Sequence, residues 1–500
     1  MVEQAVNNFL PLSNIRQKQS NNIALITFWS QFSVYALNTI LILFLTRPFL
    51  EHGLGYSQAQ AYAFIGVTQA TGYLMPVLGG FMADQVVGVR RAILFGSVML
   101  AFAYLLVMLS GYTVGTFSDK LFIAAYALVP ATNSLLMGTA SGLISRIYSD
   151  DAIQAKSAMT WYYMAINVGA LLATFIAPAL LDSRFGPLSV LTVTFIGKSI
   201  AALNFARNYH LYDNVIIGKD KLPMTAKTGY KLLAYIAIIY LFTLLAYSHI
   251  YLASIVIGTG CALGIVWFFI KTLILHGEQR TKQLMAIFLI LEAIIFFIIY
   301  NQMNSTMVLF AKNNSDLQLV GFSVSSAHYQ LLNPLLIIAL SFYLPGFYSK
   351  FPRFTIPYQF AAGTLLAGAA LLIMVFAARH AHYGLVNGNY IALTYVFITL
   401  AELWVSAIGL SMIGLYCDQN NMAFAMGVWY LASALSNAIS GRLAALVAIP
   451  EHITNPEASL LIYQHYYWWM GLGTIAIGCV MLLIARLVQT RLARKGINLA

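Results

Sequence analysis

The sequence predicts an all-α polytopic membrane protein. Of its 500 residues, 60% are hydrophobic and only 9% are charged, and the mean hydropathy is +0.78. Soluble globular proteins carry about 25% charged residues, so a soluble enzyme is excluded. Apolar stretches of roughly 20 residues, the length that crosses a bilayer as a helix, recur along the chain. The two-residue alternation typical of a membrane-spanning barrel is absent.

Apolar runs broken by Gly, Pro and charged residues predict fourteen spans. Their centres lie near residues 34, 70, 101, 132, 168, 197, 240, 262, 297, 335, 367, 402, 434 and 474. An even number places both termini on one side of the membrane. With the N-terminus inside, most of the 27 Lys and Arg residues fall in cytoplasmic segments, as is usual for membrane proteins. We therefore expect cytoplasmic termini, and a net charge of +11 that reflects topology and anionic lipid rather than nucleic acid.

The longest polar connection, residues 208–231, leads into two spans, and six spans remain on each side of this insert. Two six-helix halves that enclose a midplane binding site are the layout of the major facilitator fold. The expected divisions are a cytoplasmic N-terminal segment, a six-helix bundle, a linker with two additional spans, a second six-helix bundle and a cytoplasmic tail. They cover residues 1–20, 21–207, 208–282, 283–488 and 489–500.

Polar side chains interrupt several spans, and at bilayer depth they are costly unless they face a partner or a wet cavity. The first span carries a broad polar stripe, and five other spans repeat the pattern. These residues are Thr27, Ser30, Gln31, Tyr35 and Asn38, then Gln69, Tyr73 and Pro76, Tyr163 and Asn167, Asn301, Asn304 and Ser305, Tyr329 and Asn333, and Glu402, Ser406 and Gly409. The stripes indicate a solute cavity, and the alternative is hydrogen bonding between helices without a solute role.

Several ionisable residues, including Lys198 and Arg442, lie within the predicted spans. Glu402 lies in the middle of an apolar span, so it needs a partner, a proton or a cationic ligand, and it is the leading site residue. Glu292 falls on roughly the opposite helix face from Asn301, which favours a structural role. His328 could carry a proton or be a buried neutral side chain. Lys198 stays unassigned.

Several motifs carry a family resemblance. The stretch LGGFMADQVVGVRRAIL resembles the loop signature of major facilitators in the form used by proton-dependent oligopeptide transporters. Its motif residues are Gly79, Gly80, Asp84, Gly88, Arg90 and Arg91. YYMAINVGALL, QLLNPLLII, AELWVSAIGLSM and GVWYLASALSNAISG are similar to that family's fifth, eighth, tenth and eleventh helices. The resemblance covers nearly the whole chain, including the two extra helices of bacterial members.

The resemblance implies that Glu402, with Asn167 and Asn333, receives the amino end of a peptide. Tyr35, Tyr73 and Trp429 match cavity residues of the family. Combined with the polar stripes, the predicted substrate-binding set is Glu402, Asn167, Asn333, Tyr35, Tyr73, Tyr163, Gln31, Asn38, Asn301, Trp429 and Ser406.

The chain departs from the family where the first helix usually carries the motif ExxERFxYYG and a following arginine. Six charged family positions are neutral here, namely Thr27, Ser30, Gln31, Asn38, Met137 and Asn301. Partial loss of a buried ion network leaves a charge without its partner, whereas replacement of the whole network is tolerated. In the family the lost cations receive the peptide carboxylate and the lost acids handle the proton. The hypothesis is that a free carboxylate is no longer strongly selected.

We predict a secondary active transporter of di- and tripeptides or related small amine-bearing solutes, working by alternating access, with proton coupling through Glu402 or His328. The alternatives are a proton-independent facilitator of a non-carboxylate amine or amide solute, and a nutrient sensor that binds without transport. No enzymatic motif occurs, so we expect no enzyme, metal or cofactor. The expected partners are a peptide-like solute, protons and the lipid bilayer of the inner membrane, with the protein as a monomer.

Overall fold

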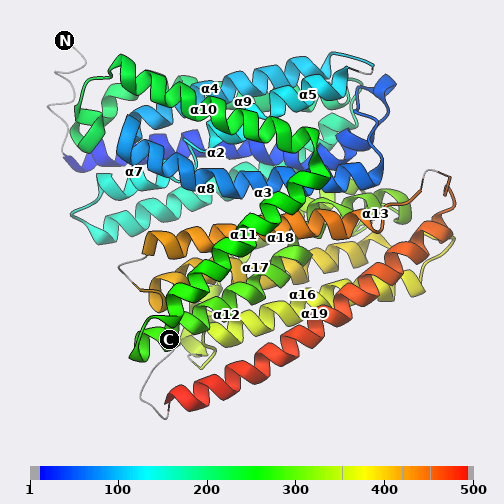
Figure 1. Cartoon of the computed structure of the whole chain (residues 1–500). Coiled ribbons are helices and arrows are strands. Elements are labelled where there is room, and N and C mark those ends of the chain that lie inside the picture. The colour runs from blue at the N-terminus through cyan, green and yellow to red at the C-terminus, as the bar shows by residue number, and fades with distance from the viewer. Residues whose placement is uncertain (1–11, 116, 352, 419–421, 451, 494–500) are drawn as a thin grey trace. The chain divides into compact units, whose positions relative to one another are not determined.

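The computed structural model describes residues 12–115, 117–351, 353–418, 422–450 and 452–493, most of which are helical (Figure 1). Ten described helices are long and apolar enough to cross a membrane, or eleven if the bent pair Ser326–Ser341 and Leu344–Lys350 is one span. Helices also lie at the three other predicted centres, near residues 70, 132 and 434, but none of them meets the combined criterion of length and hydropathy. The predicted all-α polytopic membrane fold is confirmed.

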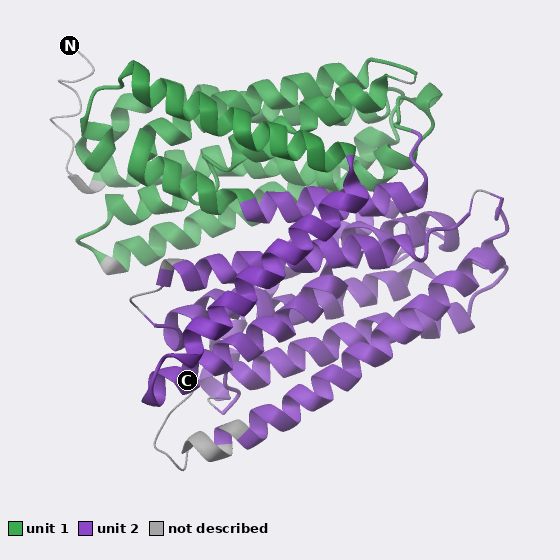
Figure 2. Ribbon diagram, viewed as in Figure 1, with its two compact units in different colours: residues 1–54, 75–248 green, residues 55–74, 249–500 purple. Residues whose placement is uncertain are grey.

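The chain divides into two compact units (Figure 2). The first contains residues 1–54 and 75–248, and the second contains residues 55–74 and 249–500. Helix α3, Gln58–Met82, contributes residues to both. The two additional helices of the predicted linker are divided between the units, with α10 in the first and α11 in the second. The domain boundaries predicted from the sequence remain a proposal.

In the first unit, α2 packs against α8 and α9, α4 packs against α9, and α10 packs against α6. Its elements besides part of α3 are α2 (Leu12–Thr46), η1 (Phe49–Glu51), the π-helical η2 (Ala83–Val87), α4 (Val89–Gly111), α5 (Ser118–Tyr126), α6 (Leu128–Asn133), α7 (Thr139–Ile147), α8 (Ala152–Leu181), α9 (Pro187–Arg207), η3 (Tyr209–Val215), η4 (Gly218–Lys221) and α10 (Ala226–Ser248). Helix α2 is therefore held by two neighbours along its length.

In the second unit, α16 packs against α17 and α19, α11 packs against α18, and α14 packs against α17. Its elements besides part of α3 are α11 (Ile250–Leu273), α12 (Gly277–Tyr300), η5 (Asn301–Asn304), α13 (Thr306–Asn314), β1 (Gln318–Leu319), β2 (Phe322–Ser323), η6 (Ser326–Leu331), α14 (Leu332–Ser341), α15 (Leu344–Lys350), α16 (Ile356–Arg379), α17 (Gly388–Tyr416), α18 (Met422–Ala445) and α19 (Pro456–Ala493). The antiparallel β1–β2 hairpin is a small addition that the sequence pattern did not predict.

Glycines allow close helix contacts in both units. A Cβ on Gly169 of α8 would come within 2.7 Å of the Phe28 carbonyl oxygen on α2. A Cβ on Gly66 of α3 would come within 2.8 Å of the Gly441 Cα on α18. Small residues are common at helix interfaces in membranes because association there depends on close packing rather than on the hydrophobic effect. These contacts hold the helices that carry the polar side chains described below.

The loop motif between α3 and α4 is held by residues of the first unit. A Cβ on Gly79 would overlap the Ser134 carbonyl group, whereas Gly80 faces open space. Of these two glycines, Gly79 is the one that packing requires. Asp84 accepts a hydrogen bond of 2.9 Å from the Arg146 guanidinium at the end of α7. This ion pair is partly exposed and contributes at most about 1 kcal/mol.

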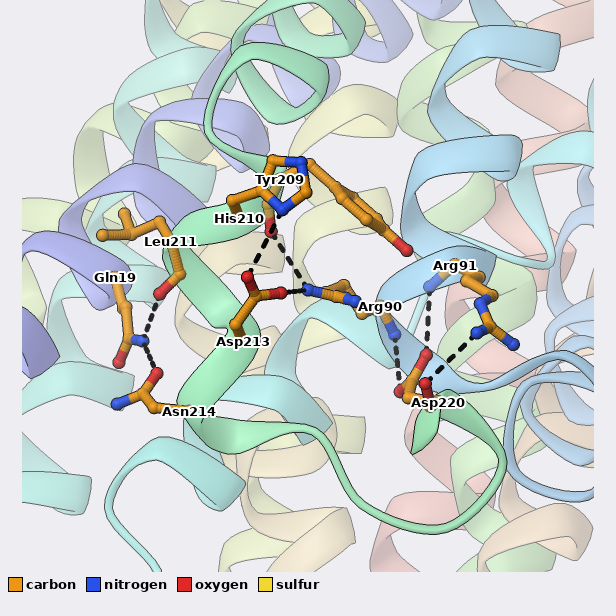
Figure 3. A network of polar contacts seen from close by, with 9 residues as sticks. All are labelled: Gln19, Arg90, Arg91, Tyr209, His210, Leu211, Asp213, Asn214 and Asp220. Atoms are coloured by element: carbon orange, nitrogen blue, oxygen red, sulfur yellow. Dashed lines mark hydrogen bonds and ion pairs between the residues drawn. The ribbon is translucent and has the colours of Figure 1, made fainter. Parts of the chain in front are cut away.

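Helix α4 is capped by a carboxylate that is distant in sequence (Figure 3). Its N-cap residue, Gly88, has a φ of +97° and no side chain to accept the first backbone N–H groups. The Asp220 carboxylate of η4 accepts the backbone N–H of Arg90 at 3.1 Å and that of Arg91 at 3.4 Å. A side chain at Gly88 would overlap Asp220, so glycine is required here by both the backbone angle and the space.

The connection between α9 and α10 also contacts the Arg90 side chain. The buried Arg90 guanidinium forms an ion pair with Asp213 and lies 4.1 Å from the centre of the Tyr209 ring (Figure 3). Tyr212 donates hydrogen bonds to Asn22 at 2.7 Å and to the carbonyl oxygen of Gln19 at 3.2 Å. Burial raises the pKa of the Tyr212 hydroxyl, so it remains a neutral donor. The connection is thereby attached to both α2 and α4.

We expect Asp220→Ala to destabilise the protein, because α4 loses its only described cap. Loss of an N-terminal cap costs about 1 kcal/mol. Thermal unfolding of the purified protein measures the effect, and Asp182→Ala is the matched control because Asp182 is an exposed acid of the same unit. Equal melting temperatures for D220A and D182A would refute the capping role.

Candidate functional site

The leading site residue, Glu402, is held in a polar cluster of the second unit. It lies on α17, and its Oε2 atom accepts a hydrogen bond of 2.6 Å from the Asn333 side chain on α14. The same Asn333 amide nitrogen is 3.2 Å from the Thr399 hydroxyl oxygen on α17. Asn333 is 8% exposed, so this amide is committed to the acid and the hydroxyl rather than to water. The structure thus brings together two residues that the sequence assigned to the amine end of the site.

Helices α17 and α14 position the side chains of this hydrogen-bonded cluster. Thr399 lies three residues before Glu402, so the two side chains share one face of α17. The Thr399 hydroxyl donates to the carbonyl oxygen of Tyr395 at 2.8 Å, and the Tyr395 hydroxyl donates to that of Met303 at 2.7 Å. Asn333 stands in the first turn of α14. These bonds tie α17 to both α14 and η5.

Two tyrosines of the second unit interact with the acid, and Asn301 follows one of them in the sequence. The Tyr300 hydroxyl is a hydrogen-bond donor to Glu402, and Tyr73 is near enough to interact with it electrostatically. Asn301 begins η5, where α12 stops being α-helical, and its side-chain nitrogen is buried without a partner among the described residues. A buried amide donor without a partner is costly, and the role of Asn301 in solute binding stays a prediction.

The other predicted residues of this unit have different surroundings. Ser406 is half-buried one turn after Glu402. Trp429 is 4% exposed and packs against Phe297 and Phe360, and a Cβ on Gly409 would overlap its ring. The roles of Ser406 and Trp429 in binding stay predictions.

His328, the second candidate for proton coupling, lies at the start of η6. Its Nδ1 atom accepts the backbone N–H of Ser325 at 3.1 Å and lies 3.0 Å from the Ser325 hydroxyl, so the pair forms a capping box. This arrangement gives His328 a role in starting the short helix before Asn333. Its role in proton transfer stays a prediction.

In the first unit, Gln31, Tyr35 and Asn38 are half-buried on one face of α2. On α8, Tyr163 is 54% exposed, and the Asn167 side chain donates to the Tyr163 carbonyl oxygen at 2.9 Å. Asn167 is therefore bound to its own helix in this structure. These five residues form a neutral polar set, and their part in solute binding is a prediction.

The buried side of the first polar stripe contacts Lys198. Lys198 of α9 is 1% exposed, and its ammonium donates to the Ser30 carbonyl oxygen and hydroxyl, each at 2.8 Å. The ammonium lies 5.1 Å from the centre of the Tyr104 ring. No carboxylate pairs with it in the described part of the chain. The spacing of the stripe did not reveal that Ser30 points away from Gln31 and binds a cation.

Glu292 lies away from the Glu402 cluster. It is 2% exposed on α12, and one carboxylate oxygen accepts a hydrogen bond of 2.9 Å from Thr364 on α16. Its other carboxylate oxygen has no partner among the described residues. The contact joins two helices of one unit, which fits the structural role favoured from the sequence.

Sequence reasoning missed Tyr300 as a partner of Glu402 and Thr399 as a partner of the Asn333 amide. Thr399 could have been found from its three-residue spacing to the acid, and Tyr300 from its position beside Asn301. No group of three or more metal-ligating side chains occurs among the described residues. The described cluster consists of the Glu402 carboxylate, the Asn333 amide and the hydroxyl groups of Thr399 and Tyr300.

Comparison with known proteins agrees with this picture. A model of the POT family matches residues 90–468. Dipeptide and tripeptide permease A of Chromobacterium violaceum is 32% identical over 463 residues, 92% of this chain and 91% of that protein. The permease of the same name from Klebsiella pneumoniae is 32% identical over 466 residues, 92% of this chain and 90% of that protein. The crystal structure of tetrameric PepTSo2 has a TM-score of 0.83 and 25% identity, and the match covers 95% of this chain and 99% of that one.

The family match and the permease relatives show that this helical membrane protein is a transporter, not an enzyme. Broken helices beside a polar site are usual in secondary transporters. The chain belongs to the POT family.

We expect the effect of Ser30→Ala on stability to depend on Lys198. In the wild type, S30A removes one of the bonds to a buried ammonium and should cost about 1–3 kcal/mol. In a Lys198→Met background the buried charge is gone, and S30A should be nearly neutral. Melting temperatures of the four proteins complete the cycle. An equal loss of melting temperature on S30A substitution in the wild type and in the Lys198→Met variant would contradict the interaction.

Proposed function

We propose that this chain is a secondary active transporter of di- and tripeptides or related small amine-bearing solutes, working by alternating access with proton coupling. The hydrogen bond between Glu402 and Asn333 carries the proposal, because it places an acid and an amide side by side in a transporter. An acid within a membrane span is usually functional. The solute ammonium would bind Glu402, and a solute carbonyl group would accept from the unpartnered Asn301 amide. The names of the permease relatives support a peptide as the solute.

The second part of the proposal is that the solute needs no free carboxylate, and it rests on neutral polar residues of the first unit. Gln31, Tyr35 and Asn38 offer amide and hydroxyl groups, and Met137 offers a thioether. Charge-assisted bidentate bonds from arginine are the strong way to hold a carboxylate, and none of these residues can form them. The transporter would therefore accept solutes whose far end is an amide or another neutral group.

Glu402 is the proposed proton carrier. Its described partners are the neutral groups of Asn333 and Tyr300, so a proton can bind or leave without breaking an ion pair. A proton-independent facilitator is the alternative, favoured by the six neutral positions of the family network. A sensor that binds without transport would use the same cluster and is distinguished by flux.

The setting of the transporter is also part of the proposal. Both termini would lie in the cytoplasm, and the membrane would be the inner membrane, as the distribution of Lys and Arg suggests. The monomer would be the working unit, with residues 21–207 and 283–488 as its two bundles and residues 208–282 as the linker. The tetramer named for PepTSo2 is a property of that protein.

We expect purified protein in sealed liposomes to take up a dipeptide and its C-terminal amide with similar apparent affinity, within about threefold. The physical reason is the absence of a cation at the matching positions. Competition by both compounds against one labelled peptide measures the ratio. A preference of more than tenfold for the free acid, worth about 1.4 kcal/mol, would overturn the loss of carboxylate selection. Absence of any flux with intact binding would indicate a sensor.

We expect Glu402→Gln to abolish accumulation driven by an inward proton gradient, because glutamine cannot take up the proton. Glu292→Gln is the matched control, since Glu292 is a buried acid of the same unit outside the cluster. The control should accumulate solute as the wild type does. Full concentrative uptake by E402Q would exclude Glu402 as the essential carrier, and wild-type protein that only equilibrates the solute would support the facilitator.

A further inference from the structure

A pocket of about 560 Å³ opens on the second unit, outside the Glu402 cluster. Two cations, Lys350 at the end of α15 and Arg353 in the following loop, stand at one part of it. Neither forms an ion pair with a carboxylate among the described residues. The rest of the lining is mostly apolar and includes Ala362 and Leu365 of α16 and Leu482 of α19.

The pocket lies where two candidate spans end. The α16 span begins at Ile356, just after Lys350 and Arg353, and the α19 span ends at Leu487, just after Leu482. The cations are therefore at the level where a bilayer has its headgroups, and the aliphatic side chains continue into the level of its acyl chains. Basic pockets between membrane helices are typical sites for anionic lipid headgroups.

We propose that this pocket binds one anionic phospholipid. Lys350 and Arg353 hold the phosphate, and an acyl chain lies along Ala362, Leu365 and Leu482. The charges of the pocket complement an anionic headgroup, and the apolar lining gives the chain a surface that a soluble phosphate compound would not use. Ala362 and Leu365 lie three residues apart and so share one face of α16, which forms a continuous groove below the cations.

An aromatic cluster connects this pocket with the helix that carries Glu402. Phe354, which lines the pocket, has its ring centre 5.3 Å from that of Trp404 on α17. Phe347 of α15 lies 5.9 Å from Phe354 and 6.3 Å from Trp404. The bend of 53° between Ser326–Ser341 and Leu344–Lys350 precedes the cluster. A bound lipid would hold α15 and its loop against Trp404 of α17, which lies two residues after Glu402.

Native mass spectrometry of the full chain, released from nanodiscs containing equal amounts of phosphatidylglycerol and phosphatidylethanolamine, tests the proposal. The wild type should retain one phosphatidylglycerol in preference to phosphatidylethanolamine. The double variant Lys350→Gln with Arg353→Gln should lose this preference by about thirtyfold, since each cation near an anionic lipid contributes about fivefold. Lys227→Gln with Lys231→Gln is the matched control, because both are exposed cations of α10 outside the pocket.

A second variant, Ala362→Trp, fills the groove and leaves both cations in place. It should lose the retained phosphatidylglycerol, and melting temperatures verify that each variant is folded. Equal retention in K350Q/R353Q and the wild type would overturn the proposal, as would an equal loss in K227Q/K231Q, which would indicate general surface charge. Full retention in A362W would show that the lipid does not lie in the groove and would equally refute it. The measurement does not depend on which solute the protein carries.

Discussion

An ionisable group inside a bilayer must find its hydrogen-bond partners within the protein, and the polar structure of this transporter follows from that constraint. Glu402 forms a hydrogen bond with Asn333, Lys198 forms one with Ser30, and Glu292 forms one with Thr364. In each of these described contacts the partner is a neutral amide or hydroxyl group rather than an opposite charge. Removal of a neutral partner costs less than the loss of one ion of a buried pair. Polar sites of this kind can change while the fold is preserved.

Neutral partners also leave the charge of Glu402 free to change. A carboxylate held by an opposite charge must break that ion pair when it takes up a proton, whereas one held by donors such as Asn333 and Tyr300 keeps most of its contacts. The proposed proton carrier and the proposed ammonium site are therefore compatible in one residue. The proposed lack of selection for a free carboxylate has another basis, since Gln31, Tyr35 and Asn38 cannot form charge-assisted bidentate bonds to it.

Outside the candidate spans, contacts between residues that are far apart in the sequence hold segments for which no local sequence motif provides a cap or an anchor. Helix α4 begins at a glycine that offers no side-chain cap, and Asp220 supplies the acceptor from the connection after α9. Asp213 and Tyr209 of the same connection hold the Arg90 side chain. On the second unit, Phe354 and Trp404 join the loop before α16 to α17. The long polar connection after α9 and the short loop before α16 are thus integral to the packing of their units.

Much of the fold and part of the site could be predicted from the sequence. Hydropathy alone determines that the chain is a helical membrane protein, because uninterrupted apolar stretches have no other stable arrangement in a bilayer. A mid-span acid such as Glu402 is conspicuous for the same reason, and the family motifs added Asn333. The tertiary structure alone identified Asp220 as the cap of α4 and Ser30 as the partner of Lys198, and it placed Thr399 beside that amide. These contacts join side chains by the packing of separate helices, and helical periodicity determines which residues share a face but not which neighbouring helix that face meets.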